Sequence, residues 1–74
     1  MQTDDFRIKC YGLSELAILY NPGVLPGTAL KRLNVWIQRH ARLSADLTNA
    51  GWSKGTRLLN PRQVSIIVQH LGAP

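Results

Sequence analysis

The chain has 74 residues, so we expect one domain over residues 1–74 with a thin hydrophobic core. Hydrophobic residues make up 45% and charged residues 18%, which excludes a disordered composition. Residues 1–30 hold two basic and three acidic residues, a net charge of −1, whereas residues 31–74 hold seven basic residues and one acidic residue, a net charge of +6. Such a basic C-terminal half favours DNA or an acidic protein surface as partner.

The N-terminal residues and the lone cysteine indicate the compartment. Cys10 is the only cysteine, which excludes an internal disulfide and fits a reduced setting; we expect its thiol to be buried. Residues 1–5 lack the apolar stretch of a secretory signal and are expected to form a flexible N-terminus. The longest apolar runs are too short to span a bilayer. We therefore expect a cytoplasmic protein with no membrane partner.

The segment after the N-terminus predicts an extended arm followed by a helix. Apolar residues from Phe6 to Cys10 alternate with Arg7 and Lys9, a strand-like pattern that either pairs with another strand or packs alone. A helix over Leu13–Tyr20 follows, with one apolar face. It is preceded by a glycine that can serve as N-cap and is ended by the sequence Asn-Pro-Gly.

The second predicted helix, over Thr28–His40, carries the strongest periodic signal in the chain. The connection before it, residues 21–27, contains two prolines and two glycines and is longer than the usual helix-turn-helix turn of 3–4 residues. Five residues of the helix form an apolar stripe: Ala29, Leu30, Leu33, Trp36 and Ile37.

Two more helices are predicted. Ser44 is expected to cap a short helix over Ala45–Ala50, which Gly51 ends. After an irregular stretch in which Lys54 and Gly55 form a turn, the sequence Asn-Pro-Arg-Gln from residue 60 predicts a helix start with a capping box, and Gly72 the helix end. The apolar faces together predict one core: Leu16, Tyr20, Leu30, Leu33, Trp36, Ile37, Leu47, Val64, Ile67 and Leu71.

A long residue pattern covers almost the whole chain from Tyr11 onward. It comprises Tyr11-Gly12, Glu15-Leu16-Ala17, Tyr20-x-Pro22, Ala29, Leu33, Trp36-Ile37, Leu47, Gly51-Trp52, Pro61-x-Gln63-Val64, Ile67 and Leu71-Gly72-x-Pro74. This pattern resembles a family of short bacterial proteins from gut anaerobes, known only as a domain of unknown function. The resemblance implies a shared helical fold, and it supplies no catalytic or binding residues.

The sequence holds no set of residues typical of an enzyme. Cys10, His40 and His70 lie on three separate predicted elements, which predicts no metal site. Each carboxylate has a structural explanation at a terminus or at a helix start, so no acid–base pair is evident. We therefore expect no enzymatic activity, no cofactor and no small-molecule ligand.

The basic face of the second helix is the candidate site. Arg32, Val35 and Arg39 align along it, and arginines both read base edges and bind phosphates. Further positive charges follow the helix and precede the last helix, where a wing could contact the phosphate backbone. The candidate nucleic-acid-binding residues are Arg32, Val35, Arg39, Arg42, Lys54 and Arg57.

The fold class that follows is mainly α: a small four-helix domain, helix-turn-helix-like, with a short N-terminal extended arm. The leading hypothesis is a nucleic-acid-binding or regulatory accessory protein whose partner is DNA. The alternative is a protein-interaction module with no nucleic-acid role, which binds an acidic or apolar protein surface. Exposed Val35 and Ile66 would mark its contact patch.

Overall fold

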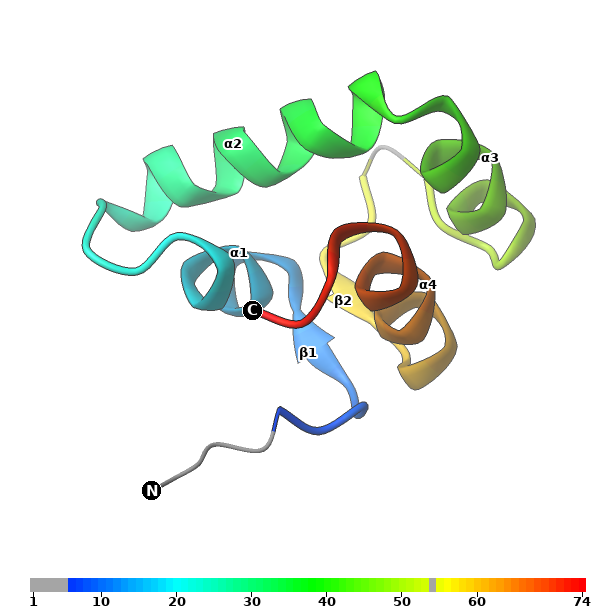
Figure 1. The fold of residues 1–74 in the computed structure, drawn as a ribbon, viewed down its shortest axis with the longest axis horizontal. Helices are drawn as coiled ribbons and strands as arrows, with labels where there is room; N and C mark the ends of the chain where they lie inside the picture. The colour runs from blue at the N-terminus through cyan, green and yellow to red at the C-terminus, as the bar shows by residue number, and fades with distance from the viewer. Residues whose placement is uncertain (1–5, 54) are drawn as a thin grey trace.

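The computed structural model of the chain describes residues 6–53 and 55–74, and it is mainly α-helical (Figure 1). The described residues form four helices and one short two-stranded sheet, as the sequence predicted for the fold class. In chain order the elements are β1 (Tyr11–Gly12), α1 (Leu13–Tyr20), α2 (Pro26–Arg39), α3 (Ala41–Asn49), β2 (Leu58–Leu59) and α4 (Pro61–Leu71).

The other helices pack around α2. In Figure 1, α2 runs across the top of the molecule, α1 and α4 lie beneath it, seen nearly end-on, and α3 lies beside the end of α2. The C-terminus comes back to α1, which places the last residues close to the first helix. One side of α2 therefore packs on the other helices, and its other side faces outward.

The small sheet ties the start of α1 to the segment before α4. β1 and β2 are antiparallel, with Tyr11 opposite Leu59 and Gly12 opposite Leu58. The Leu13 amide extends this contact by donating to the Arg57 carbonyl oxygen at 2.7 Å. Two segments more than forty residues apart are thus joined by backbone hydrogen bonds, which no local sequence pattern predicts.

The predicted arm over residues 6–10 forms no strand: it bends at Lys9, and the sheet begins at Tyr11. Phe6 stacks on the Tyr11 ring, with centroids 5.3 Å apart and an interplanar angle of 8°. Ile8 and Cys10 are exposed. The prediction that the Cys10 thiol is buried was wrong, because this segment pairs with no strand that would cover its side chains.

The first helix begins and ends where the sequence predicted, whereas α2 begins two residues earlier than predicted. Pro26 occupies the first turn of α2 after an extended Leu25, since its fixed φ angle suits that position. The connection between α1 and α2 therefore shortens to residues 21–25. This length is closer to a helix-turn-helix turn than the seven residues expected from the sequence.

The start of α3 differs most from the prediction. The helix begins at Ala41, four residues before the predicted start, and Ser44 lies inside it instead of capping it. His40 is the N-cap: its Nδ1 accepts a hydrogen bond from the Leu43 amide at 3.3 Å. An unprotonated ring nitrogen thus replaces the usual oxygen acceptor, and one residue separates α2 from α3.

The last helix begins as predicted, at a reciprocal capping box. The Gln63 amide donates to Asn60 Oδ1 at 2.8 Å, and the Asn60 amide donates to Gln63 Oε1 at 3.0 Å. The buried Gln63 side chain also donates from Nε2 to the Ala50 carbonyl oxygen at 3.1 Å. Gly72 follows the helix with a φ of +87°, a backbone conformation that favours glycine.

The core lies between α2 and the other elements. Six of the predicted core residues are fully buried: Leu16, Leu33, Ile37, Leu47, Val64 and Ile67. Four others are half-buried and pack against the core: Tyr20, Leu30, Trp36 and Leu71. The prediction missed Leu43, which lies between two predicted helices, and Leu59, which lies in the stretch expected to be irregular; both are fully buried.

We expect Leu33→Ala to cost about 2–5 kcal/mol of unfolding free energy, since it leaves a cavity under α2. Chemical denaturation of both proteins measures this difference. The matched control on the same helix is Gln38→Ala, which is exposed and should change stability by less than about 0.5 kcal/mol. Equal losses for the two variants would contradict the observed core.

We expect Asn60→Ala to cost about 0.5–2 kcal/mol, because the Gln63 amide loses its acceptor at the start of α4. Asn60→Asp retains a side-chain oxygen at that position and should restore most of the loss. Thermal denaturation of the three proteins at neutral pH measures both effects. A wild-type melting temperature for Asn60→Ala would show that the cap contributes nothing.

Candidate functional site

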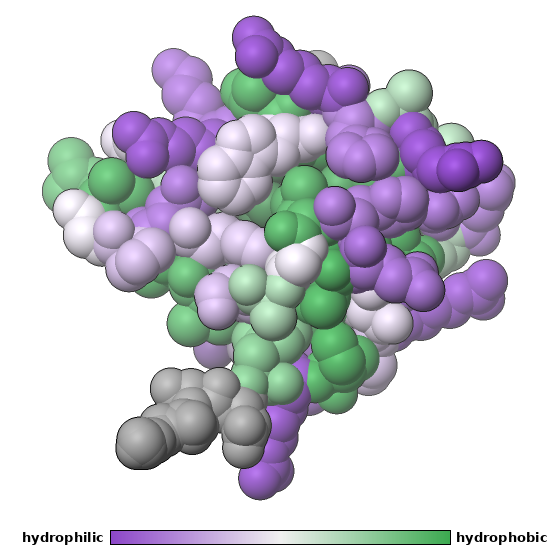
Figure 2. Space-filling model, viewed as in Figure 1, coloured by the Kyte–Doolittle hydropathy of each residue, from purple (hydrophilic) through white to green (hydrophobic). Residues whose placement is uncertain are grey.

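The outward side of α2 carries the predicted arginines. Arg32 and Arg39 are exposed, and Val35 between them is 38% exposed. Figure 2 shows strongly hydrophilic side chains gathered along the edge of the molecule over α2, with apolar surface below them. In the described part of the chain the only basic side chain within 4.0 Å of a carboxylate is His70, beside Asp46, so no carboxylate there neutralises these arginines.

Two hollows lie on either side of Trp36. The first, which we call the Trp36–Leu71 hollow, has a volume of about 570 Å³. Its lining residues are Trp36, Arg39, His40, Ala41, Arg42 and Leu71. The second, which we call the Val35 hollow, has a volume of about 290 Å³ and is lined by Thr28, Lys31, Arg32, Val35 and Trp36.

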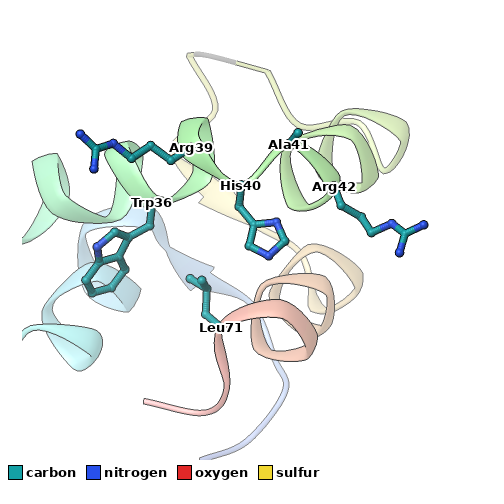
Figure 3. Close-up of a pocket in the computed structure, with 6 residues that line it drawn as sticks. All are labelled: Trp36, Arg39, His40, Ala41, Arg42 and Leu71. Atoms are coloured by element: carbon teal, nitrogen blue, oxygen red, sulfur yellow. The ribbon is translucent and has the colours of Figure 1, made fainter.

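The Trp36–Leu71 hollow has an apolar centre and a charged rim. Figure 3 shows Trp36 and His40 extending from the end of α2 toward the side of Leu71, while Arg39 and Arg42 extend outward on opposite sides. Arg42 is in the first turn of α3, which follows α2 after one residue. This short corner is the reason that arginines from two helices border one hollow.

Trp36 is held by the aromatic residue at the end of α1. Its ring meets Tyr20 edge-on, with centroids 6.2 Å apart and an interplanar angle of 87°. The Tyr20 hydroxyl donates to the Gly72 carbonyl oxygen, which ties α1 to the residue after α4. Trp36 is therefore a positioned, half-buried side chain, where the sequence predicted a core residue.

Burial raises the pKa of Tyr20 to about 12. Because the folded pKa exceeds the ordinary value of 10.0, this group's stabilisation is fully present below pH 10 and is lost as pH rises from 10 toward 12. We expect Tyr20→Phe to show a smaller fall in melting temperature than the wild type across this window. Circular dichroism melts at pH 9, 10, 11 and 12 measure it, and parallel curves for the two proteins would contradict the assignment.

The structure brings together two histidines that the sequence left on separate elements. The rings of His40 and His70 meet with centroids 4.9 Å apart, and His70 Nε2 lies 3.0 Å from Asp46 Oδ2. These contacts hold the corner between α2 and α3 against α4. Within the residues described, no group of three or more histidine, cysteine or acidic side chains is arranged to hold a metal ion.

The predicted wing is separated from the arginines of α2. Arg57 lines a third hollow of about 220 Å³ with residues that include Leu30 and Asn34. At about 100° per residue, those two positions lie on the opposite flank of α2 from Arg32 and Arg39. Lys54, the other wing residue, lies outside the described residues.

The structure thus gathers four of the predicted residues, Arg32, Val35, Arg39 and Arg42, around Trp36. The sequence did not predict that Trp36, His40 and Leu71 line this surface. Each of them already has a structural explanation, on an apolar helix face or at a helix end. One signal was present: Trp36 stands at the margin of the apolar stripe, directly beside the arginine side of the helix.

In the described residues, no helix is long and apolar enough to cross a bilayer.

Comparison with known proteins assigns a family and nothing beyond it. The family model described as a domain of unknown function (DUF4248) matches residues 7–74. No curated protein and no solved structure matches the chain.

Proposed function

The chain belongs to the DUF4248 family, a domain of unknown function, and we propose that it binds nucleic acid through α2 as a small helix-turn-helix-like accessory protein. The observation that carries this proposal is the row of exposed, unneutralised arginines. Arg32, Arg39 and Arg42 have no carboxylate partner among the described residues. Phosphate groups are the counterions that such a surface attracts.

The helix geometry supports contact with a duplex. Arg32 and Arg39 are seven residues apart, which at 1.5 Å per residue separates them by about 10 Å along α2. That span is comparable to the roughly 12 Å width of the major groove. Val35 between them is partly exposed and can contact a thymine methyl group. The buried face of α2 is not disturbed by such a contact, because Leu33 and Ile37 point the other way.

Packing of α2 on α1 supports the helix-turn-helix-like arrangement. The connection of residues 21–25 is short, and Figure 1 shows α2 crossing over the end of α1 with its outer side unobstructed. In a helix-turn-helix, the second helix enters the groove while the first packs behind it. Arg57 lies on the other flank of α2 and Arg42 lies on α3, so the proposed duplex interface on α2 consists of Arg32, Val35 and Arg39.

The alternative is a protein-interaction module, and the exposed apolar side chains favour it. Leu25 is 75% exposed, Leu58 is 67% exposed, and Val35 lies on the α2 surface itself. Ile66, which the sequence placed in the contact patch, is half-buried against the core. An apolar contact of this kind weakens little as salt rises, whereas phosphate binding weakens steeply.

The test is fluorescence anisotropy with a random-sequence DNA duplex at low and moderate salt. We expect wild-type affinity to fall steeply with salt, and the double variant Arg32→Ala/Arg39→Ala to reduce the slope of log K against log salt by about 1–2. Its melting temperature should stay near that of the wild type, because exposed charges contribute little to stability.

Arg57→Ala is the matched control. It also removes one positive charge, but from the loop that passes along the other flank of α2. We expect it to weaken duplex binding less than Arg32→Ala alone or Arg39→Ala alone does. Absence of duplex binding at low salt, or equal binding by the wild type and the double variant, would overturn the proposal in favour of the interaction module.

A further inference from the structure

The Trp36–Leu71 hollow combines an aromatic wall with flanking positive charges. Its volume of about 570 Å³ lies within the range typical of small-ligand pockets, roughly 300–1,000 Å³. Trp36, His40, Ala41 and Leu71 give it an apolar and aromatic lining, and its only charged residues are two arginines. A ligand that fits therefore has a flat apolar or aromatic body and carries negative charge.

The indole ring of Trp36 is fixed before any ligand arrives. Its edge-on contact with Tyr20 holds the ring, and the Tyr20 hydroxyl is itself held by the Gly72 carbonyl oxygen. Trp36 lines both hollows on the outer surface, so part of the ring faces solvent. Fixed aromatic rings of this kind are the surfaces on which unpaired bases stack.

The positions of the two arginines narrow the choice of ligand. Arg39 and Arg42 extend outward on opposite sides of the hollow instead of converging on one point (Figure 3). A nucleotide within a strand has a phosphate on both its 5′ and its 3′ side, whereas a free mononucleotide or a single carboxylate presents its charge on one side. Two separated positive charges therefore fit a strand, which carries a phosphate at every nucleotide, better than a ligand with one charged group.

We propose that the Trp36–Leu71 hollow binds one unpaired nucleotide of a single-stranded nucleic acid, with its base against Trp36 and Leu71 and with phosphates of the strand at Arg39 and Arg42. A base inside a duplex is covered by its neighbours, so only an unpaired base presents its face to the hollow. The inference rests on the proposed nucleic-acid role, because Arg39 belongs to both surfaces. It adds a second, strand-specific element to the duplex contact of α2.

The experiment uses Trp36 as its own reporter. Trp52→Phe leaves Trp36 as the only tryptophan. Trp52 Nε1 is buried without an acceptor among the described residues, so the substitution removes no hydrogen bond of that part of the chain. We expect ten-nucleotide oligo(dA) and oligo(dT) to quench Trp36 fluorescence saturably at low salt. We expect a duplex of the same length to quench it at least about tenfold less effectively.

Two variants separate the hollow from the duplex surface. Trp36→Leu keeps an apolar side chain but removes the aromatic ring. Arg42→Ala removes a positive charge that lies outside α2. We expect each variant to bind a labelled oligo(dT) about tenfold more weakly than the wild type. Duplex binding should fall by less than threefold in both. Arg62→Ala, an exposed arginine of α4 that lines none of the three hollows, should change neither affinity. Melting curves show whether each variant is folded. If Trp36→Leu is unfolded, the effect of Arg42→Ala on oligo(dT) binding tests the proposal.

The outcomes distinguish failure of this inference from failure of the proposed function. Duplex binding that depends on Arg32, without quenching by either oligonucleotide, overturns the inference and leaves the proposed function standing. Adenosine monophosphate that quenches Trp36 as well as oligo(dA) overturns the strand requirement. An acidic peptide with one phenylalanine that binds in a Trp36- and Arg42-dependent manner, while oligonucleotides do not, assigns the hollow to a protein partner. Absence of binding to any nucleic acid removes both proposals.

Discussion

Burial of one side of α2 is the constraint on which the rest of the structure depends. Leu33 and Ile37 are fully buried on that side, beneath the longest helix of the molecule. Fully burying a leucine or isoleucine side chain is worth about 1.5–3 kcal/mol, a large fraction of the stability of a small domain. The same burial turns the opposite side of α2 outward. The rotation of this one helix therefore determines both which residues form the core and which residues form the basic surface.

Polar contacts at the ends of the helices then fix the arrangement around that core. Gln63 joins the start of α4 to the end of α3, and His70 joins the end of α4 to Asp46 of α3. Tyr20 joins α1 to Gly72. Each such bond contributes about 0.5–1.5 kcal/mol net, but leaving a buried partner unsatisfied costs more. The bonds specify one packing, and in that packing the hollow beside Trp36 stays open.

The basic surface has little effect on folding, which makes it informative about function. Exposed arginines contribute almost nothing to stability, and a row of like charges repels itself slightly. Arg32, Arg39 and Arg42 nevertheless lie around one half-buried tryptophan, within two consecutive helices. The two proposals assign this surface to one class of ligand. Under the first proposal the α2 arginines contact the phosphates and grooves of a duplex; under the second the hollow between α2, α3 and the end of α4 receives an unpaired base.

Features that depend on near neighbours in the chain were predictable from the sequence. The bounds of α1, the capping box at Asn60 and the buried positions of α2 all follow from residues within one or two helical turns. The tertiary structure alone decided the features that depend on distant residues. His40 caps α3 and starts it early while its ring meets His70, and the pairing of β1 with β2 leaves Cys10 outside the sheet. Trp36 is half-buried, which the periodicity of α2 does not predict because it does not specify which neighbours cover the helix. Arg57 lies on the other flank of α2, which the periodicity does not predict either because it does not specify where a loop from another part of the chain passes.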